Sequence, residues 1–514
     1  MRILFIFYED PGNPVSFPLG IGLLSALLKK QGHTVKGIHI HNDLKEPDIM
    51  EGIVSSVKRF HPNLLAYSCT SPSFQNVKTI AAQLRREVGT PAICGGPHPT
   101  LYPRETLIVE GIDYVCVGDG ENTLVEFVKT LEKGENCSRI PGISFLNEKA
   151  ELLKNRLYPL VQALDSLPWI DYDVFGNRFI EQLTSGGWLR HITSRGCPYN
   201  CSYCHTPMFR KVYSEGVGVP EGKLGYVRLR SVDSLIEEFI SMVRKYDLKV
   251  INFMDDLFCL KKDRVLDFCR NFKERLPEHV GYSIQTHLQH LDKEVVAALY
   301  DSRCLRVVVG VESGAKRILK LFNRKTTPER MKKKLLLLVK TRFPLGTWSL
   351  NILGNPTETR EDMLQTLALN AQALVEKAKF NIMAPYPKSK IYDYCIEENL
   401  FVGNPDNQDF KDRSVTKLKF PDRESAFLEK FFDIGHWYMN ILAPLSLEDY
   451  YQSLINEVEQ LGPGEWNKVR DYYIKVDANL SHSFLTKRIP HYTFVFREQV
   501  YSNVIGLFNG GTDS

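Results

Sequence analysis

The sequence lacks any long apolar run. No stretch approaches the roughly 18 apolar residues of a membrane span, and the short apolar run in MRILFIFYEDPG is followed at once by acidic residues, unlike a signal peptide. We therefore expect a cytoplasmic protein. The net charge is small, +4 over 514 residues, without a dense Lys/Arg block suited to a phosphate backbone, so no nucleic-acid partner is expected.

Cysteines are few and mostly scattered. In a reducing compartment the 11 cysteines should be thiols or metal ligands rather than a disulfide framework. Three of them are close together, at Cys197, Cys201 and Cys204. Four of the others lack close spacing and are interpreted as core thiols rather than as ligands of further clusters: Cys259, Cys269, Cys304 and Cys395.

The length predicts two or three domains at about 100–200 residues each. Residues 1–135 alternate between apolar strand-like runs and helical patterns, which favours a doubly wound, Rossmann-like parallel sheet. Strands are expected near residues 2–7, 34–40, 63–68, 91–94 and 114–117, and helices near residues 19–31, 48–60, 74–88 and 121–132. Residues 136–185 are predicted to form a linker that contains a hairpin at 142–155.

Residues 186–400 alternate again. Strands are expected at residues 189–193, 250–254, 281–285, 306–311, 347–353 and 380–384, and the clearest helices at 232–246 and 361–378. Six strand–helix units are fewer than the eight of a closed barrel, so we expect a partial (β/α)6 TIM-like barrel with its chemistry at the carboxyl ends of the strands. Residues 401–514 are predicted to be a small, mainly helical domain, with helices at 424–442, 446–460 and 464–475.

The three close cysteines form a C-x3-C-x2-C motif just after the first barrel strand. Three thiolates can hold three irons of a cubane cluster and leave the fourth iron open to a small molecule. A structural zinc site would need a fourth ligand, and His205 is poorly placed beside Cys204. The segment from Cys201 to His205 also fits the C-x-x-C-H haem pattern, but the third cysteine and the absence of an export signal weigh against it.

This motif, with an aromatic residue before its last cysteine, resembles the signature of the radical S-adenosylmethionine (SAM) superfamily. The resemblance implies a 4Fe–4S cluster held by Cys197, Cys201 and Cys204. Its open iron would bind the amino and carboxylate groups of SAM, and reductive cleavage would give a 5′-deoxyadenosyl radical. Tyr203 would lie against the adenine, and the further SAM contacts implied at strand ends are Asp255, Glu312, Ser313 and Asn355.

Two of these acids have simpler interpretations. Asp255 stands where the family often has Gly-Gly-Glu, and it could instead be one of two solvated acids that cap the next helix. Glu312 directly follows an apolar strand, so its carboxylate should be exposed at the barrel mouth or paired. It could also be an acid near a helix start.

Gly- and Pro-rich turns follow the strands of the first domain, and their order resembles the cobalamin-binding domain that precedes the barrel in one large subfamily. The cobalamin contacts that this implies are Leu19, Gly20, Ser68, Cys69, Thr70, Gly95, Gly96, Pro97, His98, Gly118, Gly120 and Glu121. No Asp-x-His-x-x-Gly motif is present, so no histidine ligand to cobalt is predicted. A histidine packed in its turn, or solvated, is the simpler interpretation of His98, and Cys69 could be a small buried hydrophobe.

The resemblance implies a cobalamin-dependent radical SAM enzyme. We expect a methyltransferase that acts on an unactivated carbon, or on phosphorus, of a small molecule or lipid through the 5′-deoxyadenosyl radical and methylcobalamin. An oxidative cyclase or oxidoreductase without methyl transfer would use the same residues. A non-catalytic iron–sulfur or cobalamin-binding protein is the alternative from another class. The reaction also implies an electron donor such as flavodoxin or ferredoxin.

Overall fold

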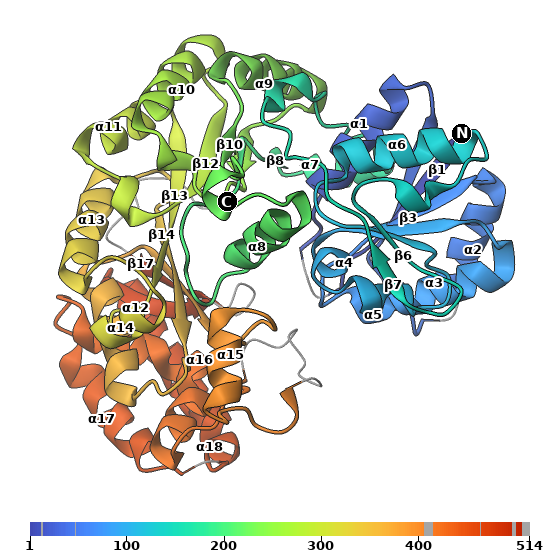
Figure 1. Cartoon of the computed structure of the whole chain (residues 1–514). Coiled ribbons are helices and arrows are strands. Elements are labelled where there is room, and N and C mark those ends of the chain that lie inside the picture. The colour runs from blue at the N-terminus through green and yellow to red at the C-terminus, as the bar shows by residue number, and fades with distance from the viewer. Residues whose placement is uncertain (12–13, 47, 406–414, 463, 496–499, 506–514) are drawn as a thin grey trace. The chain divides into compact units, whose positions relative to one another are not determined.

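The computed structural model describes residues 1–11, 14–46, 48–405, 415–462, 464–495 and 500–505 (Figure 1). The chain divides into two compact units. Unit 1 comprises Met1–Pro198 and Thr206–Met254, and unit 2 comprises Tyr199–His205 and Asp255–Ser514. Within the described ranges, no helix has both the length and the apolar character needed to span a bilayer.

Unit 1 begins with a seven-stranded sheet in the order β2-β1-β3-β4-β5-β6-β7. The first five strands are parallel, and the last two form an antiparallel hairpin, as predicted. The order 2-1-3-4-5 is that of a flavodoxin-like doubly wound sheet. The strands are β1 (Arg2–Tyr8), β2 (Thr34–Ile40), β3 (Leu64–Ser68), β4 (Ala92–Gly95), β5 (Tyr114–Cys116), β6 (Ile143–Leu146) and β7 (Leu152–Lys154).

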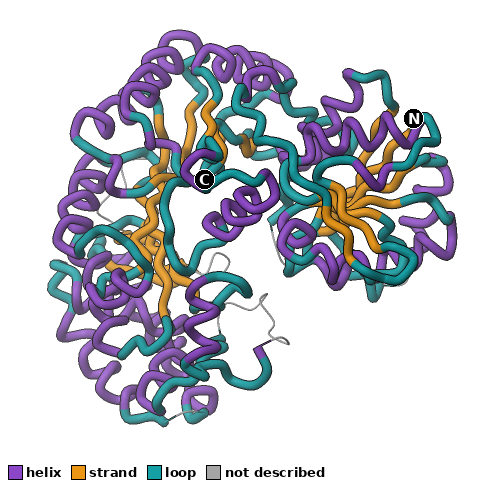
Figure 2. The backbone as a smooth tube through the Cα atoms, viewed as in Figure 1, coloured by secondary structure: helices purple, strands orange, loops and turns teal. Residues whose placement is uncertain are grey.

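Helices pack around this sheet because their apolar residues recur at helical spacing. In α3, Val77, Ile80, Ala81 and Leu84 lie on one face and are fully buried. Figure 2 shows these helices around the strands of the sheet. The predicted helices are α1 (Leu19–Lys30), α2 (Ile49–Phe60), α3 (Phe74–Val88) and α6 (Gly120–Glu132), and two short helices that were not predicted are α4 (Pro97–Leu101) and α5 (Pro103–Leu107).

The rest of unit 1 holds the first two barrel strands, β8 (Trp188–His191) and β11 (Val250–Phe253), which pair in parallel. Two short strands pair in antiparallel fashion around the cysteine motif: β9 (Ser194–Arg195) precedes the motif in the chain, and β10 (Arg228–Leu229) follows it. The helices here are α7 (Asn177–Thr184), α8 (Thr206–Val217) and α9 (Val232–Tyr246). The predicted linker therefore contains a helix, α7, in addition to the hairpin.

A buried polar network ties this linker to β8. The Tyr172 hydroxyl lies 2.8 Å from the carbonyl of Arg190 and 2.9 Å from Nδ1 of His191. His191 and Glu238 are buried, with Nε2 of His191 3.7 Å from the carboxylate. Burial lowers the pKa of His191 to about 4, so this imidazole is neutral at pH 7.

Unit 2 contains four parallel strands in the order β15-β14-β13-β12. They are β12 (Gly281–Thr286), β13 (Cys304–Glu312), β14 (Thr347–Leu353) and β15 (Lys377–Ile382). With β8 and β11 of unit 1, the chain therefore has the six barrel strands expected. The helices that follow these strands are α10 (Lys262–Arg275), α11 (Lys293–Asp301), α12 (Lys316–Leu321), α13 (Pro328–Thr341), α14 (Arg360–Gln372) and α15 (Lys390–Glu397).

Two predictions for unit 2 were wrong in detail. The helix predicted at 361–378 ends at residue 372, and β15 begins at residue 377 rather than 380. The carboxy-terminal part is helical in α16 (Asp422–Leu442), α17 (Glu448–Glu459) and α18 (Trp466–Thr486) but also has two strands, β16 (His491–Val495) and β17 (Val500–Ile505). These extend the sheet, because β17 pairs antiparallel with β15.

Candidate cofactor site

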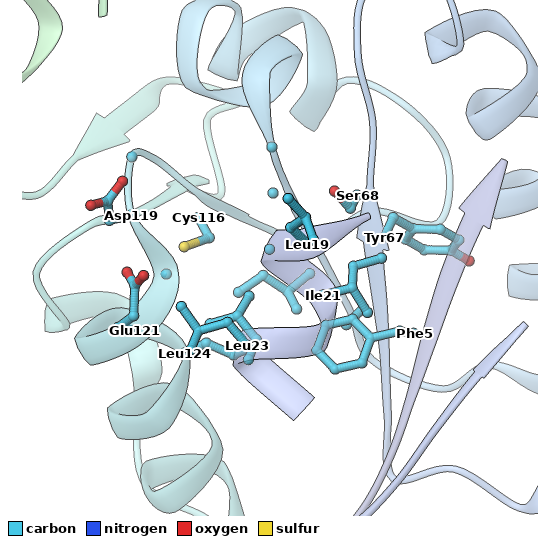
Figure 3. A pocket seen from close by; sticks show the side chains of 18 of the residues that line it. Phe5, Leu19, Ile21, Leu23, Tyr67, Ser68, Cys116, Asp119, Glu121 and Leu124 are labelled. Atoms are coloured by element: carbon cyan, nitrogen blue, oxygen red, sulfur yellow. The ribbon is translucent and has the colours of Figure 1, made fainter. Parts of the chain in front are cut away.

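A cavity of about 300 Å³ lies at the carboxyl ends of the parallel strands in unit 1 (Figure 3). β1 and β3 are neighbours here although β2 follows β1 in the chain, so this is the topological switch point where such sheets bind ligands. Apolar side chains of α1 and α6 form one part of the wall, and the carboxylates of Asp119 and Glu121 form another.

The cavity gathers most of the residues predicted to bind cobalamin. Those that line it are Leu19, Gly20, Ser68, Gly95, Gly96, Gly118, Gly120 and Glu121. Glycine leaves room at Gly20, where a Cβ would meet no atom within 4 Å. At Gly96 the backbone has a positive φ of 102°, and a Cβ would lie 2.8 Å from the carbonyl oxygen of Cys69, so only glycine fits there.

Four predicted contacts do not line the cavity: Cys69, Thr70, Pro97 and His98. Cys69 is buried beside Cys94, with the two sulfurs 3.8 Å apart. His98 is buried in α4 and stacks on Phe74 with ring centroids 3.8 Å apart. His98 is therefore packed rather than solvated, although against α3 rather than within its own turn, and the interpretation of Cys69 as a buried hydrophobe is confirmed.

The acidic side of the cavity is held by cations from the segment around the cysteine motif. Asp119 accepts hydrogen bonds from Arg195 at 3.2 Å, from Arg228 at 2.8 Å and from the Tyr213 hydroxyl at 2.7 Å. Burial alone would raise the pKa of Asp119, but the two guanidinium groups outweigh it and hold that pKa below its usual value. This network was not predicted, because its cations lie some 75 to 110 residues further along the chain.

Glu121 has a hydrogen-bonding position to spare. One carboxylate oxygen lies 2.6 Å from Arg195, and the other is buried without a partner in the described part of the chain. A buried acceptor is costly unless a donor reaches it. The amide groups around a corrin ring are such donors, so the cavity fits cobalamin in chemistry as well as in position.

The cysteine motif is divided between the units, with Cys197 in unit 1 and Cys201 and Cys204 in unit 2. All three thiols are partly exposed, whereas the other eight cysteines are buried. Gly196 has a φ of 84°, and a Cβ there would clash with the carbonyl oxygen of Tyr226. Among the described residues, no three His, Cys, Asp or Glu side chains are already arranged as a metal site.

In unit 2 the loop with Cys201 and Cys204 is held by the end of α12. The Ser202 amide donates to the Phe322 carbonyl at 3.1 Å, and its hydroxyl donates to the Leu321 carbonyl at 2.8 Å. Asn323 donates to the carbonyl of Asn200 at 2.9 Å. These contacts anchor the loop at Asn200 and Ser202, directly beside Cys201.

Tyr203 and Glu312, both predicted to contact SAM, are close to a buried arginine that was not predicted. Arg324 lies 3.3 Å from the Tyr203 hydroxyl and 3.8 Å from the Glu312 carboxylate, and it also reaches the thiol of Cys201. Burial raises the pKa of Glu312, although Arg324 opposes the rise. Of the two expectations for Glu312, exposed or paired, the second is confirmed, because its carboxylate is paired with Arg324.

Local backbone geometry explains how Glu312 is presented. It ends β13 with a φ of 67° at a break in the strand register, and its side chain folds back over Gly310, where any Cβ would clash with the carboxylate. Because α12 begins only at Lys316, Glu312 is not a helix-starting acid.

The remaining predicted SAM contacts are buried. Asp255 is 1% exposed and Lys261 precedes the next helix, so Asp255 is neither solvated nor a helix cap. The hydroxyl of Ser313 lies 3.3 Å from that of Thr366. Asn355 donates to Glu358 at 3.0 Å, while its own side-chain oxygen has no partner among the described residues.

Comparisons with protein families agree with these two regions. The "Radical SAM superfamily" model matches residues 191–369, and the "B12 binding domain" model matches residues 13–128. The chain is a radical SAM enzyme with a B12-binding domain. Its cofactors are a 4Fe–4S cluster, SAM and cobalamin.

Known relatives of this radical SAM enzyme carry different descriptions. It is 29% identical to the "uncharacterized methyltransferase PH0819" of Pyrococcus horikoshii, over 75% of this chain and 80% of that protein. It is 23% identical to the anaerobic magnesium-protoporphyrin IX monomethyl ester cyclase of Cereibacter sphaeroides, over 76% of this chain and 63% of the cyclase.

A solved structure shares the fold of this radical SAM enzyme. The cobalamin-dependent SAM radical enzyme OxsB, with aqua-cobalamin and SAM bound, aligns with a TM-score of 0.66 at 16% identity. The alignment covers 95% of this chain and 72% of OxsB.

Proposed function

We propose that this cobalamin-dependent radical SAM enzyme is a methyltransferase that acts on an unactivated carbon or on phosphorus of a small molecule or lipid. The observation that carries the proposal is the cavity at the switch point of the unit 1 sheet, with its bare glycine backbone and the spare carboxylate oxygen of Glu121. A relative described as a methyltransferase, matched over most of both chains, supports it.

In this proposal each set of residues has a separate task. Cys197, Cys201 and Cys204 hold the cluster, and iron–thiolate bonding supplies the free energy that gathers them. Tyr203, Glu312 and Arg324 hold SAM: an arginine suits its carboxylate, and the buried Glu312 suits its ammonium or ribose groups. When bound, the cluster would supply the electron for SAM cleavage, and cobalamin would supply a methyl group.

The pocket residues orient the methyl donor rather than react with it. Glu121 would accept a hydrogen bond from an amide of the corrin, and Arg195 holds Glu121 in place through their contact of 2.6 Å. A fixed geometry of this kind is a large part of catalysis when two bound groups must meet. The apolar wall of α1 and α6 excludes water from the same space.

A cyclase or oxidoreductase remains the second candidate because one relative is described as a cyclase. The two differ in one product. A methyltransferase of this type transfers a methyl group from SAM to its cobalamin and releases S-adenosylhomocysteine, whereas an oxidative cyclase releases only 5′-deoxyadenosine.

The test uses the full chain, purified anaerobically, reconstituted with iron, sulfide and hydroxocobalamin, and desalted. Retained cluster and corrin absorbance establishes the holoprotein. Reductant and SAM are then added without substrate, and both nucleoside products are quantified by mass spectrometry. We expect about one S-adenosylhomocysteine per bound cobalamin. A holoprotein that forms 5′-deoxyadenosine but no S-adenosylhomocysteine would refute methyl transfer, and Cys197→Ala, which should lose 5′-deoxyadenosine, is the control for the cluster.

A further inference from the structure

A basic groove of about 590 Å³ lies along α12 in unit 2. The cations that line it are Lys316, Arg317, Lys320, Arg324 and Lys325. Residues 316–334 contain nine Lys or Arg and one acid, although the whole protein carries a net charge of only +4. The expectation that the chain has no dense Lys/Arg block was therefore wrong for this segment. The charge therefore gathers on one surface, which the overall composition does not reveal.

Three of these cations are available to a partner. Arg317 is paired with Asp362 at 2.8 Å, and Arg324 is buried against Glu312. Lys316, Lys320 and Lys325 are exposed, and none of them forms an ion pair within the described part of the chain. Exposed lysines in a groove attract an acidic surface over a distance and so raise the rate of encounter.

The groove is continuous with the loop that bears two of the cluster cysteines. Asn323 lines the groove and donates to the carbonyl of Asn200. Arg324, in the same wall, reaches the hydroxyl of Tyr203 and the thiol of Cys201. A protein seated in the groove would thus contact residues that themselves touch the cluster loop, which is the short path that electron transfer requires.

We propose that this groove is the docking surface for a small acidic electron-transfer protein, of the flavodoxin or ferredoxin type, that reduces the cluster. This inference rests on the proposed function for the existence of the cluster. The docked partner gives up one electron and is oxidised. That electron breaks the carbon–sulfur bond of SAM at the cluster, which leaves methionine and the 5′-deoxyadenosyl radical.

The test compares two triple variants of the full chain. The groove variant reverses the charge of the three exposed groove lysines and is Lys316→Glu/Lys320→Glu/Lys325→Glu. The control variant reverses the charge of three exposed lysines on α10 and α18 and is Lys273→Glu/Lys468→Glu/Lys475→Glu. Oxidation of a reduced acidic flavodoxin by the reconstituted protein is followed by stopped flow at several salt concentrations. 5′-Deoxyadenosine formation with dithionite is measured in parallel.

We expect the groove variant to lose roughly 10- to 100-fold in the rate with flavodoxin at low salt, and to lose its salt dependence. Its activity with dithionite and the behaviour of the control variant should stay within about twofold of wild type, as should a Lys→Arg triple variant, because it keeps the charge. Equal rates in the groove and control variants would overturn the proposal, as would an equal loss with dithionite.

Binding separates this proposal from the function on which it rests. Oxidised flavodoxin is titrated against each variant by calorimetry, which needs no cluster. A wild-type protein without a cluster would refute the proposed function, yet weaker flavodoxin binding by the groove variant alone would still support the docking surface. If the wild-type protein bound an RNA but no flavodoxin, and the groove variant lost that RNA binding, the proposed docking surface for an electron-transfer protein would be overturned.

Discussion

Gly20 offers a direct test of the cobalamin pocket. It is the second residue of α1 and lines the cavity, and a Cβ there would meet no atom within 4 Å. Gly52 in α2 has the same free surroundings but does not line the cavity. Gly20→Leu and Gly52→Leu are therefore matched, since each replaces a helical glycine with a better helix former, worth about 1 kcal/mol.

The expected size of the effect follows from the cavity. A leucine side chain fills roughly 100 Å³ at protein packing density, against a cavity of about 300 Å³. Overpacking of this kind costs about 1–3 kcal/mol, so cobalamin should bind to Gly20→Leu roughly 5- to 150-fold more weakly than to the wild type. Gly20→Ala should give a smaller loss.

Equilibrium dialysis of the apoprotein against hydroxocobalamin, read from the corrin absorbance, measures both variants. Thermal denaturation of the apoproteins shows whether each remains folded. If Gly20→Leu and Gly52→Leu bound cobalamin equally well, the cavity would not be the cobalamin site, and the role of Glu121 would fall with it.

Three further predictions concern stability, each measured by thermal or chemical denaturation of the apoprotein. Asp119→Asn should lose about 2–4 kcal/mol at pH 7, because two guanidinium groups lose their counter-charge. The pKa of Asp119 is lower in the folded protein than in the unfolded chain. The stability difference between the wild type and Asp119→Asn should therefore be full at a pH above the unfolded-state pKa, and it should shrink as the pH falls through the folded-state pKa. A constant difference down to pH 2 would contradict this. Burial raises the pKa of Glu358 to about 8. The wild type should therefore lose stability relative to Glu358→Gln as the pH rises from 5 to 8, by at most about 1.4 kcal/mol per pH unit. Parallel curves of stability against pH for the two proteins would show that Glu358 does not titrate in this range. Tyr172→Phe leaves His191 without its buried partner and should cost about 1–3 kcal/mol, whereas Tyr300→Phe, at a half-exposed position, should cost almost nothing.

The sequence was sufficient for the parts of the fold that depend on local patterns. Each strand–helix unit of the first sheet repeats a short apolar run and an amphipathic helix, so the boundaries of β2 and α3 were predicted to the residue. The start of β15 was missed because Val375-Glu-Lys-Ala378 continues the polar and apolar spacing of α14. The strands β16 and β17 were missed because β17 joins the sheet by pairing with β15, which is far away in the chain, and β16 pairs in turn with β17.

The candidate site divides in the same way. Gly95, Gly96, Gly118 and Gly120 lie at or just after the ends of β4 and β5, so a local motif indicated them. Arg324 lies 12 residues beyond Glu312, within a run of surface cations, and nothing in its immediate surroundings marks it as buried. The cations around Asp119 come from β9 and β10, and only the folded chain brings them to the turn after β5.

The pairing of β17 with β15 has a consequence for how the protein is made. On one side residues 377–379 pair with β14, and on the other side they pair with residues 500–502. At about 5–20 residues per second, the ribosome needs roughly 6 to 25 s to synthesise the intervening chain. Throughout that time the outer edge of β15 presents unpaired amide and carbonyl groups, which is the kind of edge that recruits strands from other molecules. Slow translation or crowded expression should therefore favour aggregation of the nascent chain at this edge, and a chain shortened before residue 500 should keep the liability permanently.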